Sequence, residues 1–478
     1  MPGMARRRKR RSRQAVPSVA SEFVEADLGD ERLTSRLVQL AGAFSAAPNH
    51  SFPDMLGSEA DLEALYRFET NDRVEPQDIV ASHAKETGLR CKETSTVVIP
   101  HDTTDCAFSN EVEREGLGPL GGKKRGFLLH ASLAVAADGY RRPLGVLNAI
   151  TWVREERRRK SKAKQADDVK ESARWIEGVR GARAHLAPGV TAIHVMDREG
   201  DAYPLLAAMV TEGDRFVVRS AQDRIVLEDG ERLHLREAIA QADAKVEIEV
   251  ALSKRGEGKT PYHRETFPAR DRRKAMLNFS AKRLLLKRPK NIPVEDLPGE
   301  LALNVVHVWE PHPPEGVEPV EWLLLTTEPV DEPKQITAVV NYYRTRWVIE
   351  EFFKALKTGC AFESRQLTTY HGLLVALMIF LPIACRLLFI RSLARSEPKA
   401  PASLELTATE IDVLRRFSQR VRVGKSPTIR EALLAVAGLG GHLKRNGDPG
   451  WLTLARGMEK LLSLTAGWTA AIESNATR

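Results

Sequence analysis

Residues 343–359 read YRTRWVIEEFFKALKTG, and the spacing of residues in this stretch is the most informative feature of the sequence. Four residues suited to binding a metal or a phosphate occur there at offsets of 0, 3, 7 and 14: Tyr343, Arg346, Glu350 and Lys357. At about 100° per residue, they fall within roughly a 60° arc of an α-helix. The stretch therefore predicts one helical face that presents a carboxylate among phosphate-binding groups.

The opposite side of the same helix is apolar. It carries Phe352 and Leu356, with Ile349 alongside. An apolar stripe of this kind is typical of a helix that packs on a sheet. The pattern begins near Pro333 and has a suitable stop at Gly359, so we expect one helix over residues 333–358 that closes a core.

Strand signals come earlier in the chain, in a definite order. Residues 96–102, 127–136 and 143–153 predict a three-stranded meander, with a turn at Asp138-Gly139. A helix (167–184), a strand (192–197), a second helix (203–210) and another strand (215–220) are expected to follow. Antiparallel strands followed by strand-helix-strand favour an α/β fold with an RNase H-like mixed sheet.

Two acidic residues end strands of this predicted core. Asp102 is expected to end the first strand, and Asp197 ends the apolar strand 192–197. The two strands are neighbours in an RNase H-like sheet, and the closing helix can bring Glu350 over them. The sequence thus predicts three carboxylates at one place.

The remaining segments suggest the domain organisation. Residues from about 221 to 330 contain alternating strands and no long helical pattern, so we expect a β-rich insertion within a catalytic domain that covers 76–371. An N-terminal helical domain (21–75) and a C-terminal helical domain (372–478) are expected to flank it. Asp30, and Ser58 with Asp61, are the expected caps of two helices in the N-terminal domain.

The basic residues are clustered. The net charge is +8, and residues 6–13, 154–164 and 270–287 are rich in Lys and Arg. Such clusters suit a polyanion, but solvated protein faces are an equally good interpretation. We expect residues 1–20 to form a disordered basic tail. Arg32 and Arg36 share one helical face and Arg67 lies on another, as in a helix-turn-helix-like DNA reader or in ordinary solvated helices.

Cysteine usage and hydropathy indicate an intracellular protein. The four cysteines show no paired spacing, so neither a disulfide framework nor a zinc knuckle is predicted. The basic N-terminus has no apolar segment behind it, and therefore does not suit a secretory signal. The apolar run 373–385 is too short for a bilayer and contains Pro382, so we expect a buried helix, a cytoplasmic location and no membrane.

Three motifs carry a resemblance to a known family. Y-x2-R-x3-E-x6-K, HDTTD at 101–105 and MDREGD at 196–201 occur in one order along the chain. Together they resemble the signatures of the bacterial insertion-sequence-four family of DDE cut-and-paste transposases. The resemblance extends from Leu28 to about Leu367. It implies an enzyme that binds the inverted repeats of transposon ends, cleaves them and joins their 3′-OH ends to target DNA.

Phosphodiester cleavage explains the need for the carboxylates. The reaction requires an activated water and a stabilised leaving oxyanion, which two Mg²⁺ ions supply, with Mn²⁺ as a substitute. Mg²⁺ prefers oxygen ligands, so Asp102, Asp197 and Glu350 are the expected ligands and catalytic residues. No small-molecule cofactor is expected.

The resemblance also implies partners and DNA contacts. It assigns Tyr343, Arg346 and Lys357 to phosphates of the transposon end, with Arg219 nearby. It assigns Trp322 to stacking on an extruded base, whereas without the resemblance a core aromatic is the better interpretation. Double-stranded transposon-end and target DNA are the expected partners, with a homodimer formed through 372–478 in the paired-end complex and a location at the bacterial nucleoid.

Several residues and alternative functions remain beside this interpretation. His101 is expected to pack on the face opposite Asp102, because adjacent strand residues point to opposite sides. Asp105, Glu199 and Asp201 are expected to be solvated or paired with Arg198 rather than to bind metal. A junction resolvase and a catalytically idle, transposase-derived regulator are the two competing functions.

Overall fold

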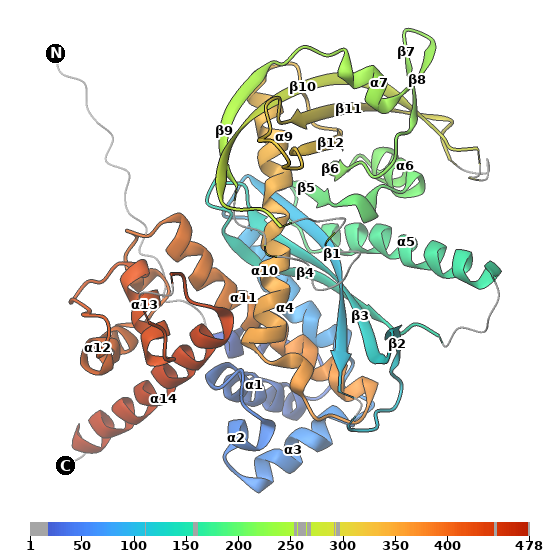
Figure 1. The fold of residues 1–478 in the computed structure, drawn as a ribbon. Coiled ribbons are helices and arrows are strands. Elements are labelled where there is room, and N and C mark those ends of the chain that lie inside the picture. Colours follow the sequence, from blue (N-terminus) through green and yellow to red (C-terminus); the bar gives the residue numbers. More distant parts are fainter. Residues whose placement is uncertain are drawn as a thin grey trace, which may run out of the picture. The chain divides into compact units, whose positions relative to one another are not determined.

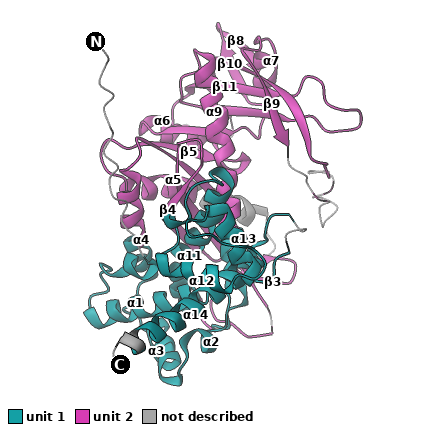
Figure 2. Ribbon diagram, turned by 90° about the vertical axis from the view of Figure 1, so that its left-hand side faces the viewer, with its two compact units in different colours: residues 1–82, 354–367, 371–478 teal, residues 83–353, 368–370 magenta. Residues whose placement is uncertain are grey.

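The computed structural model describes residues 18–109, 111–155, 161–252, 269–290, 297–443 and 447–476, with single residues 256, 264 and 292. The chain divides into two compact units (Figure 2). Unit 1 combines the chain up to Ser82 with Lys354–Leu367 and His371–Arg478, and unit 2 comprises His83–Phe353 and Thr368–Tyr370. Most of the expected basic tail, and residues 156–160 of the second basic cluster, lie outside the described residues.

The described strands of unit 2 form one continuous sheet (Figure 1). They are β1 (Thr96–Phe108), β2 (Gly118–Gly121), β3 (Lys124–Ala136), β4 (Pro143–Trp152), β5 (Thr191–Met196), β6 (Arg215–Arg219), β7 (Ile225–Glu228), β8 (Glu231–His234), β9 (Val246–Leu252), β10 (Arg273–Lys287), β11 (Glu300–Trp309) and β12 (Glu321–Thr326). Their order is β2-β3-β1-β5-β6-β12-β11-β10-β7-β8, with β4 beside β3 and β9 beside β10.

The first half of this sheet is the RNase H-like core that the sequence predicts. Its order is β4-β3-β1-β5-β6, in which β1, β3 and β4 are antiparallel and β5 and β6 run parallel to β1. The expectation that the first strand ends at Asp102 is wrong. β1 continues to Phe108, because β3 is equally long and pairs with it as far as Phe108↔Arg125.

The predicted β-rich insertion is continuous with the core. β12 pairs with β6 through Leu324↔Arg219, and the insertion strands extend the sheet from there. β10, which the sequence showed only as a basic cluster, alternates buried and exposed residues along most of its length. A half-buried strand with a cationic outer face therefore explains that cluster.

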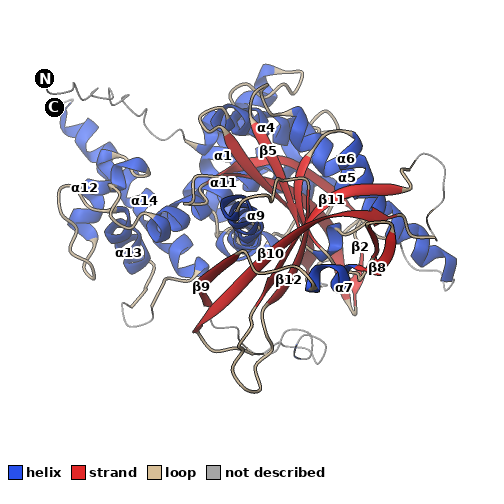
Figure 3. Cartoon of the chain, turned by 90° about the horizontal axis from the view of Figure 1, so that it is seen from above, coloured by secondary structure: helices blue, strands red, loops and turns tan. Residues whose placement is uncertain are grey.

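Helices cover both faces of the sheet in unit 2 (Figure 3). They are α4 (Pro76–Cys91, which begins in unit 1), α5 (Ser161–Ala184), α6 (Tyr203–Thr211), α7 (Leu235–Ala240), α9 (Pro333–Thr345) and α10 (Trp347–Lys354), with a short turn η2 (Arg198–Gly200). α9 packs Val339 and Tyr343 against the face that carries Val98 and Val195. Trp175 of α5 packs on the other face, next to Met196.

The single helix expected over 333–358 is interrupted twice. α9 and α10 are separated at Arg346, and a π-helical turn, η3 (Ala355–Gly359), follows α10. A π turn bonds i to i+5 and so departs from the α-helical spacing. Lys357 lies in this turn, so the spacing of about 100° per residue behind the predicted face does not apply to it.

Unit 1 is helical. It contains η1 (Val19–Phe23), α1 (Glu31–Ala46), α2 (Phe52–Leu56), α3 (Glu59–Glu69), η4 (Phe362–Ser364), α11 (Tyr370–Ser396, which begins in unit 2), η5 (Ala402–Leu404), α12 (Ala408–Phe417), α13 (Ile429–Leu439) and α14 (Trp451–Ala476). Asp30 caps α1 and Ser58 caps α3, as predicted. α11 is long and apolar enough to cross a bilayer, but 83% of its most apolar window is buried, as the prediction of a buried helix requires.

The N-terminal and C-terminal helices share one unit, although the sequence suggested two domains over 21–75 and 372–478. Phe44 of α1 stacks on Phe380 of α11 with ring centroids 5.1 Å apart. The buried Arg365 donates to the carbonyls of His50, Pro48 and Cys360. Contacts between distant segments explain this grouping, and sequence periodicity does not reveal them.

Candidate active site

Strand alternation places Asp102 and Asp197 on the same face of the sheet. Val98 and Val195 belong to the core under α9, so Asp102 and Asp197, an even number of residues further along each strand, are on that side too. β1 and β5 are parallel, and their pairing ends at Pro100↔Val195. The two aspartates follow this last pair by two residues on each strand, and so lie side by side.

Asp102 is buried among like charges. Its side chain is 15% exposed and accepts a hydrogen bond of 2.8 Å from the Thr103 N–H. Burial, with a further contribution from the Asp197 carboxylate, raises the pKa of Asp102 to about 7, although nearby Arg346 opposes the rise. Glu350 also raises this pKa, which shows that the three carboxylates act on one another.

Arg346 provides the positive charge in this cluster. Its guanidinium lies 3.3 Å from Asp102 and 2.7 Å from Glu350, and its side chain is 8% exposed. Burial alone disfavours the cation, but Glu350, Tyr343, Asp102 and Asp197 together raise the pKa of Arg346 above its usual value. The Arg346 guanidinium therefore interacts with all three carboxylates.

The donor set fits a divalent cation in chemistry. Asp197 caps η2 by accepting the Glu199 N–H at 2.9 Å, and Glu350 of α10 is 32% exposed. Hard carboxylate oxygens in excess over cations are what Mg²⁺ or Mn²⁺ would neutralise. Among the described residues, no three acidic, histidine or cysteine side chains lie close enough together to hold a metal ion as they stand. The guanidinium of Arg346 lies between Asp102 and Glu350, which explains why their carboxylates are apart.

Tyr343 and Arg219 lie close to the carboxylates. Tyr343 is 3% exposed, packs edge-on to Trp322 at 5.4 Å, and lies near Arg219. Burial, partly offset by Tyr343, lowers the pKa of Arg219. The predicted phosphate-binding face is thus largely buried, because it faces the end of the sheet and not open solvent.

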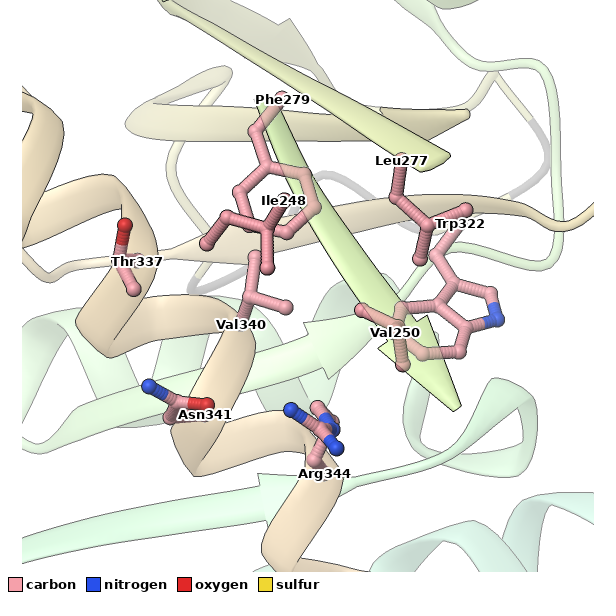
Figure 4. Close-up of a pocket in the computed structure, with 9 residues that line it drawn as sticks. All are labelled: Ile248, Val250, Leu277, Phe279, Trp322, Thr337, Val340, Asn341 and Arg344. Atoms are coloured by element: carbon pink, nitrogen blue, oxygen red, sulfur yellow. The ribbon is translucent and has the colours of Figure 1, made fainter. Parts of the chain in front are cut away.

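A cavity of about 220 Å³ adjoins this group (Figure 4). Ile248, Val250, Leu277 and Phe279 of β9 and β10 form its apolar wall. The ring of Trp322 forms another side.

Sequence reasoning missed the polar residues of this cavity. Thr337, Asn341 and Arg344 line it from α9. Their spacing of four and three residues is the signal that could have identified one helical face.

Family models match two segments of the chain. Residues 17–74 match the family described as "Transposase DNA-binding", and residues 166–385 match "Transposase DDE domain". The two matches support a DDE-type DNA transposase. Asp197 and Glu350 lie inside the second match, whereas Asp102 precedes it, so the assignment of Asp102 depends on the geometry of β1 and β5.

A likeness to a solved transposase is weak. The piggyBac transposase in a synaptic complex with hairpin DNA is 11% identical, with a TM-score of 0.32. The comparison covers 79% of this chain and 73% of that one. A score this low carries no argument about the present transposase.

Lys357 of the transposase belongs to unit 1 and pairs with an acid. Its ammonium group lies 3.4 Å from Glu363, and its side chain is 21% exposed. Its expected DNA contact therefore requires a phosphate to compete with this carboxylate.

The acids near Asp197 differ in environment. Asp201 is buried and pairs with Arg224 at 2.7 Å, so the expectation that it is solvated or paired with Arg198 is wrong. The prediction failed because the partner lies on the chain that enters the insertion. Glu199 is exposed and Asp105 is partly buried. His101 is fully buried, as expected for a packed histidine.

The basic residues named from sequence have acidic partners. Arg32 and Arg67 are 91% and 75% exposed and pair with Asp30 and Glu63. Arg36 pairs with Asp61 at 3.5 Å. In the third basic cluster, cations of β10 pair with glutamates of other strands: Arg273–Glu310, Lys274–Glu249, Lys282–Glu228 and Lys287–Glu300. Intramolecular pairing therefore accounts for much of that cluster's charge.

Proposed function

We propose that the transposase binds the inverted repeats of transposon ends, cuts them by hydrolysis and transesterification, and joins the 3′-OH ends to target DNA. The observation that carries this proposal is the convergence of Asp102 of β1, Asp197 directly after β5, and Glu350 of α10 around Arg346. The Y-x2-R-x3-E-x6-K motif supports the finer assignment to the insertion-sequence-four family.

Asp102, Asp197 and Glu350 would hold the metal, as two Mg²⁺ or Mn²⁺ ions. Bound there, the metal supplies an activated water and stabilises the leaving oxygen. The Thr103 and Glu199 N–H groups orient the two aspartates. Arg346 would leave the carboxylates and bind a DNA phosphate, since a guanidinium matches either anion.

The surrounding residues suit the end of a DNA duplex. Arg219 and Tyr343 would bind phosphates beside Arg346, and Lys357 would bind another. Trp322 would stack on an extruded base, for which the adjoining cavity offers an apolar wall and the polar groups of Asn341 and Arg344.

The N-terminal helices would bind the DNA further along the repeat. Arg32, Arg36 and Arg67 are the candidate contacts, since phosphates can replace their carboxylate partners. The basic residues at 6–13 would add affinity that depends on salt but not on base sequence. We expect the protein to act in the cytoplasm, on nucleoid DNA.

We assign pairing of two DNA ends to a homodimer formed through residues 372–478. Leu433 and Leu461 are buried within unit 1 and are therefore core residues. Phe417, Leu452 and Ile472 are between 39% and 52% exposed and are the better candidates for a partner surface. Deletion from Ile429 onward should preserve single-end binding and remove the mixed complex formed by labelled ends of two lengths.

The test of the proposed function uses the full transposase with labelled DNA carrying an element end. We expect cuts at the end sequence with Mg²⁺, none with a chelator, and none in scrambled DNA. Binding without cutting would favour a regulator. Cleavage of four-way junctions without regard to end sequence would favour a resolvase.

A further inference from the structure

The backbone pairing around Asp102 is interrupted. Pairs between β1 and β3 stop after Val98↔Val135 and resume at His101↔Ser132. Pro100 lies in this gap, and proline has no N–H to donate to a neighbouring strand. On its other side, β1 pairs with β5 only as far as Pro100↔Val195. Asp102 and Asp197 therefore both come after the last pair between β1 and β5.

Side chains connect the three strands at this level. His101 Nε2 lies 2.8 Å from His194 Nδ1 of β5, and His101 Nδ1 lies 3.0 Å from Ser132 Oγ of β3. Thr103 Oγ1 lies 3.0 Å from His130 Nδ1, which links β1 to β3 again. We call His101, His130 and His194 the histidine cluster.

The histidine cluster is fully buried and tightly covered. Its three imidazoles are at most 1% exposed. Trp175 of α5 packs edge-on to His130 at 4.8 Å. A Cβ at Gly178 would come within 2.6 Å of His130 Nε2, so only glycine lets α5 lie this close.

Packing alone does not account for three imidazoles in a core. An apolar side chain would fill the same space, whereas a buried polar group costs free energy unless it is hydrogen-bonded. The benefit is directional bonding between strands at the level where proline interrupts the backbone pairing. Asp102 is the next residue after His101, and Asp197 follows His194 by three residues.

We propose that His101, bonded to His194 and Ser132, is a positioning residue that sets the spacing of Asp102 and Asp197 for metal binding. The proposal rests on the proposed function, because it assumes that these two aspartates hold the ion. His101 would act from the face of the strands opposite the two aspartates, without contacting metal or DNA.

The test is Mn²⁺ binding to the DNA-free transposase, measured by electron paramagnetic resonance, beside end cleavage at increasing Mn²⁺. His101→Leu and His194→Leu should each weaken Mn²⁺ binding by about 10–100-fold, the usual effect of losing a group that orients a metal ligand. The double variant should bind no more weakly than the worse single variant, since each single variant already removes the hydrogen bond between His101 and His194. At saturating Mn²⁺ the cleavage rate of these variants should return to that of the wild type.

His83→Leu is the matched control. His83 is 1% exposed, also lies in unit 2 and accepts the Val146 N–H at 3.0 Å, but it is not on β1 or β5. The His83→Leu variant should lose about as much stability as His101→Leu, while its Mn²⁺ affinity stays unchanged. Equal weakening in His83→Leu, or wild-type affinity in His101→Leu, overturns the proposal.

Ser132→Ala covers the case in which His101→Leu does not fold. It removes one hydroxyl that bonds His101 and should weaken Mn²⁺ binding by a few-fold, because His101 keeps its bond to His194. Unchanged affinity in this variant overturns the proposal. A wild-type protein that neither binds Mn²⁺ nor cuts DNA would instead contradict the proposed function.

Discussion

Two buried aspartates near the end of β5 differ in their partners. Asp201 is fully buried and accepts hydrogen bonds from the Ala221 and Gln222 N–H groups and from Arg224. The side chain of Asp102 is 15% exposed, accepts the Thr103 N–H and shares Arg346 with Glu350, beside the further charge of Asp197.

This difference separates an acid with a structural role from one that we propose binds metal. Asp201 is matched by its partners and anchors the chain that enters the insertion. Around Asp102 negative charge exceeds positive charge, which lowers stability and favours a cation. Burial of an acid is therefore uninformative until its partners are counted.

The largest expected effect is loss of cleavage. Asp102→Asn, Asp197→Asn and Glu350→Gln should each lower Mg²⁺-dependent cleavage on the order of 10³-fold or more, because a metal supplies several kcal/mol of charge stabilisation. Gel shifts with end DNA should be unchanged. A variant that cuts at near wild-type rate would remove its residue from the active site.

For stability, substitution of Asp201 should have a larger effect than substitution of Asp102. Asp201→Asn leaves Arg224 buried and uncompensated, and should destabilise unit 2 by about 3–5 kcal/mol in urea unfolding. Asp102→Asn removes like-charge repulsion and should cost little stability. The exposed Asp243→Asn is the control, with an effect of about 0.5 kcal/mol or less. Equal stability of the first two variants would abolish the contrast.

The pH dependence of stability tests the burial of the histidine cluster, on the face of the sheet opposite the carboxylates. Burial lowers the pKa of His130 and His194 to about 3 and lowers that of His101 in the same direction. Below about pH 6.5 the unfolded chain binds protons that the folded protein does not bind. Stability should therefore fall as pH decreases from 6.5, by about 1.4 kcal/mol per pH unit for each histidine.

Asp102 opposes this trend, because its pKa is raised to about 7 and the folded protein binds that proton more readily. Asp102→Asn should consequently steepen the acid dependence of metal-free protein in urea titrations. An acid dependence that stays flat from pH 7 to 5 in this variant would contradict burial of the neutral histidines.

The smallest effect concerns the insertion. Trp322→Ala should weaken end-DNA binding by about 1–3 kcal/mol if a base stacks on the ring. When 2-aminopurine replaces the terminal base of the DNA, its fluorescence should change less on binding to Trp322→Ala than on binding to the wild type. Trp309→Ala, on the adjacent strand, is the control and should leave both unchanged. Equal losses in the two variants would indicate a general defect of the sheet.

Elements with strong local patterns could be predicted from sequence. The strands near 127–136, 191–197 and 215–220 alternate or are wholly apolar, and the caps at Asp30 and Ser58 depend on residues three positions away or fewer. The grouping of Asp102, Asp197 and Glu350 followed from the expected sheet order and from the family resemblance.

Features that depend on distant contacts could not be predicted. The partner of Asp201 is 23 residues away, and nothing local in sequence distinguishes Arg224 from other arginines. The π turn at Ala355–Gly359 follows residues with an ordinary α-helical pattern. The polar run after Asp102 concealed the second half of β1, because its strand character depends on pairing with β3.

Arg346 and Asp102, which contact each other, are 244 residues apart in the chain. At the usual rate of synthesis of about 5–20 residues per second, about 10–50 s separate their appearance from the ribosome. Nascent chains that stop within α9 lack both Arg346 and Glu350. Under the proposed function such chains could not complete the group of three carboxylates, and truncated products would be at most DNA-binding competitors.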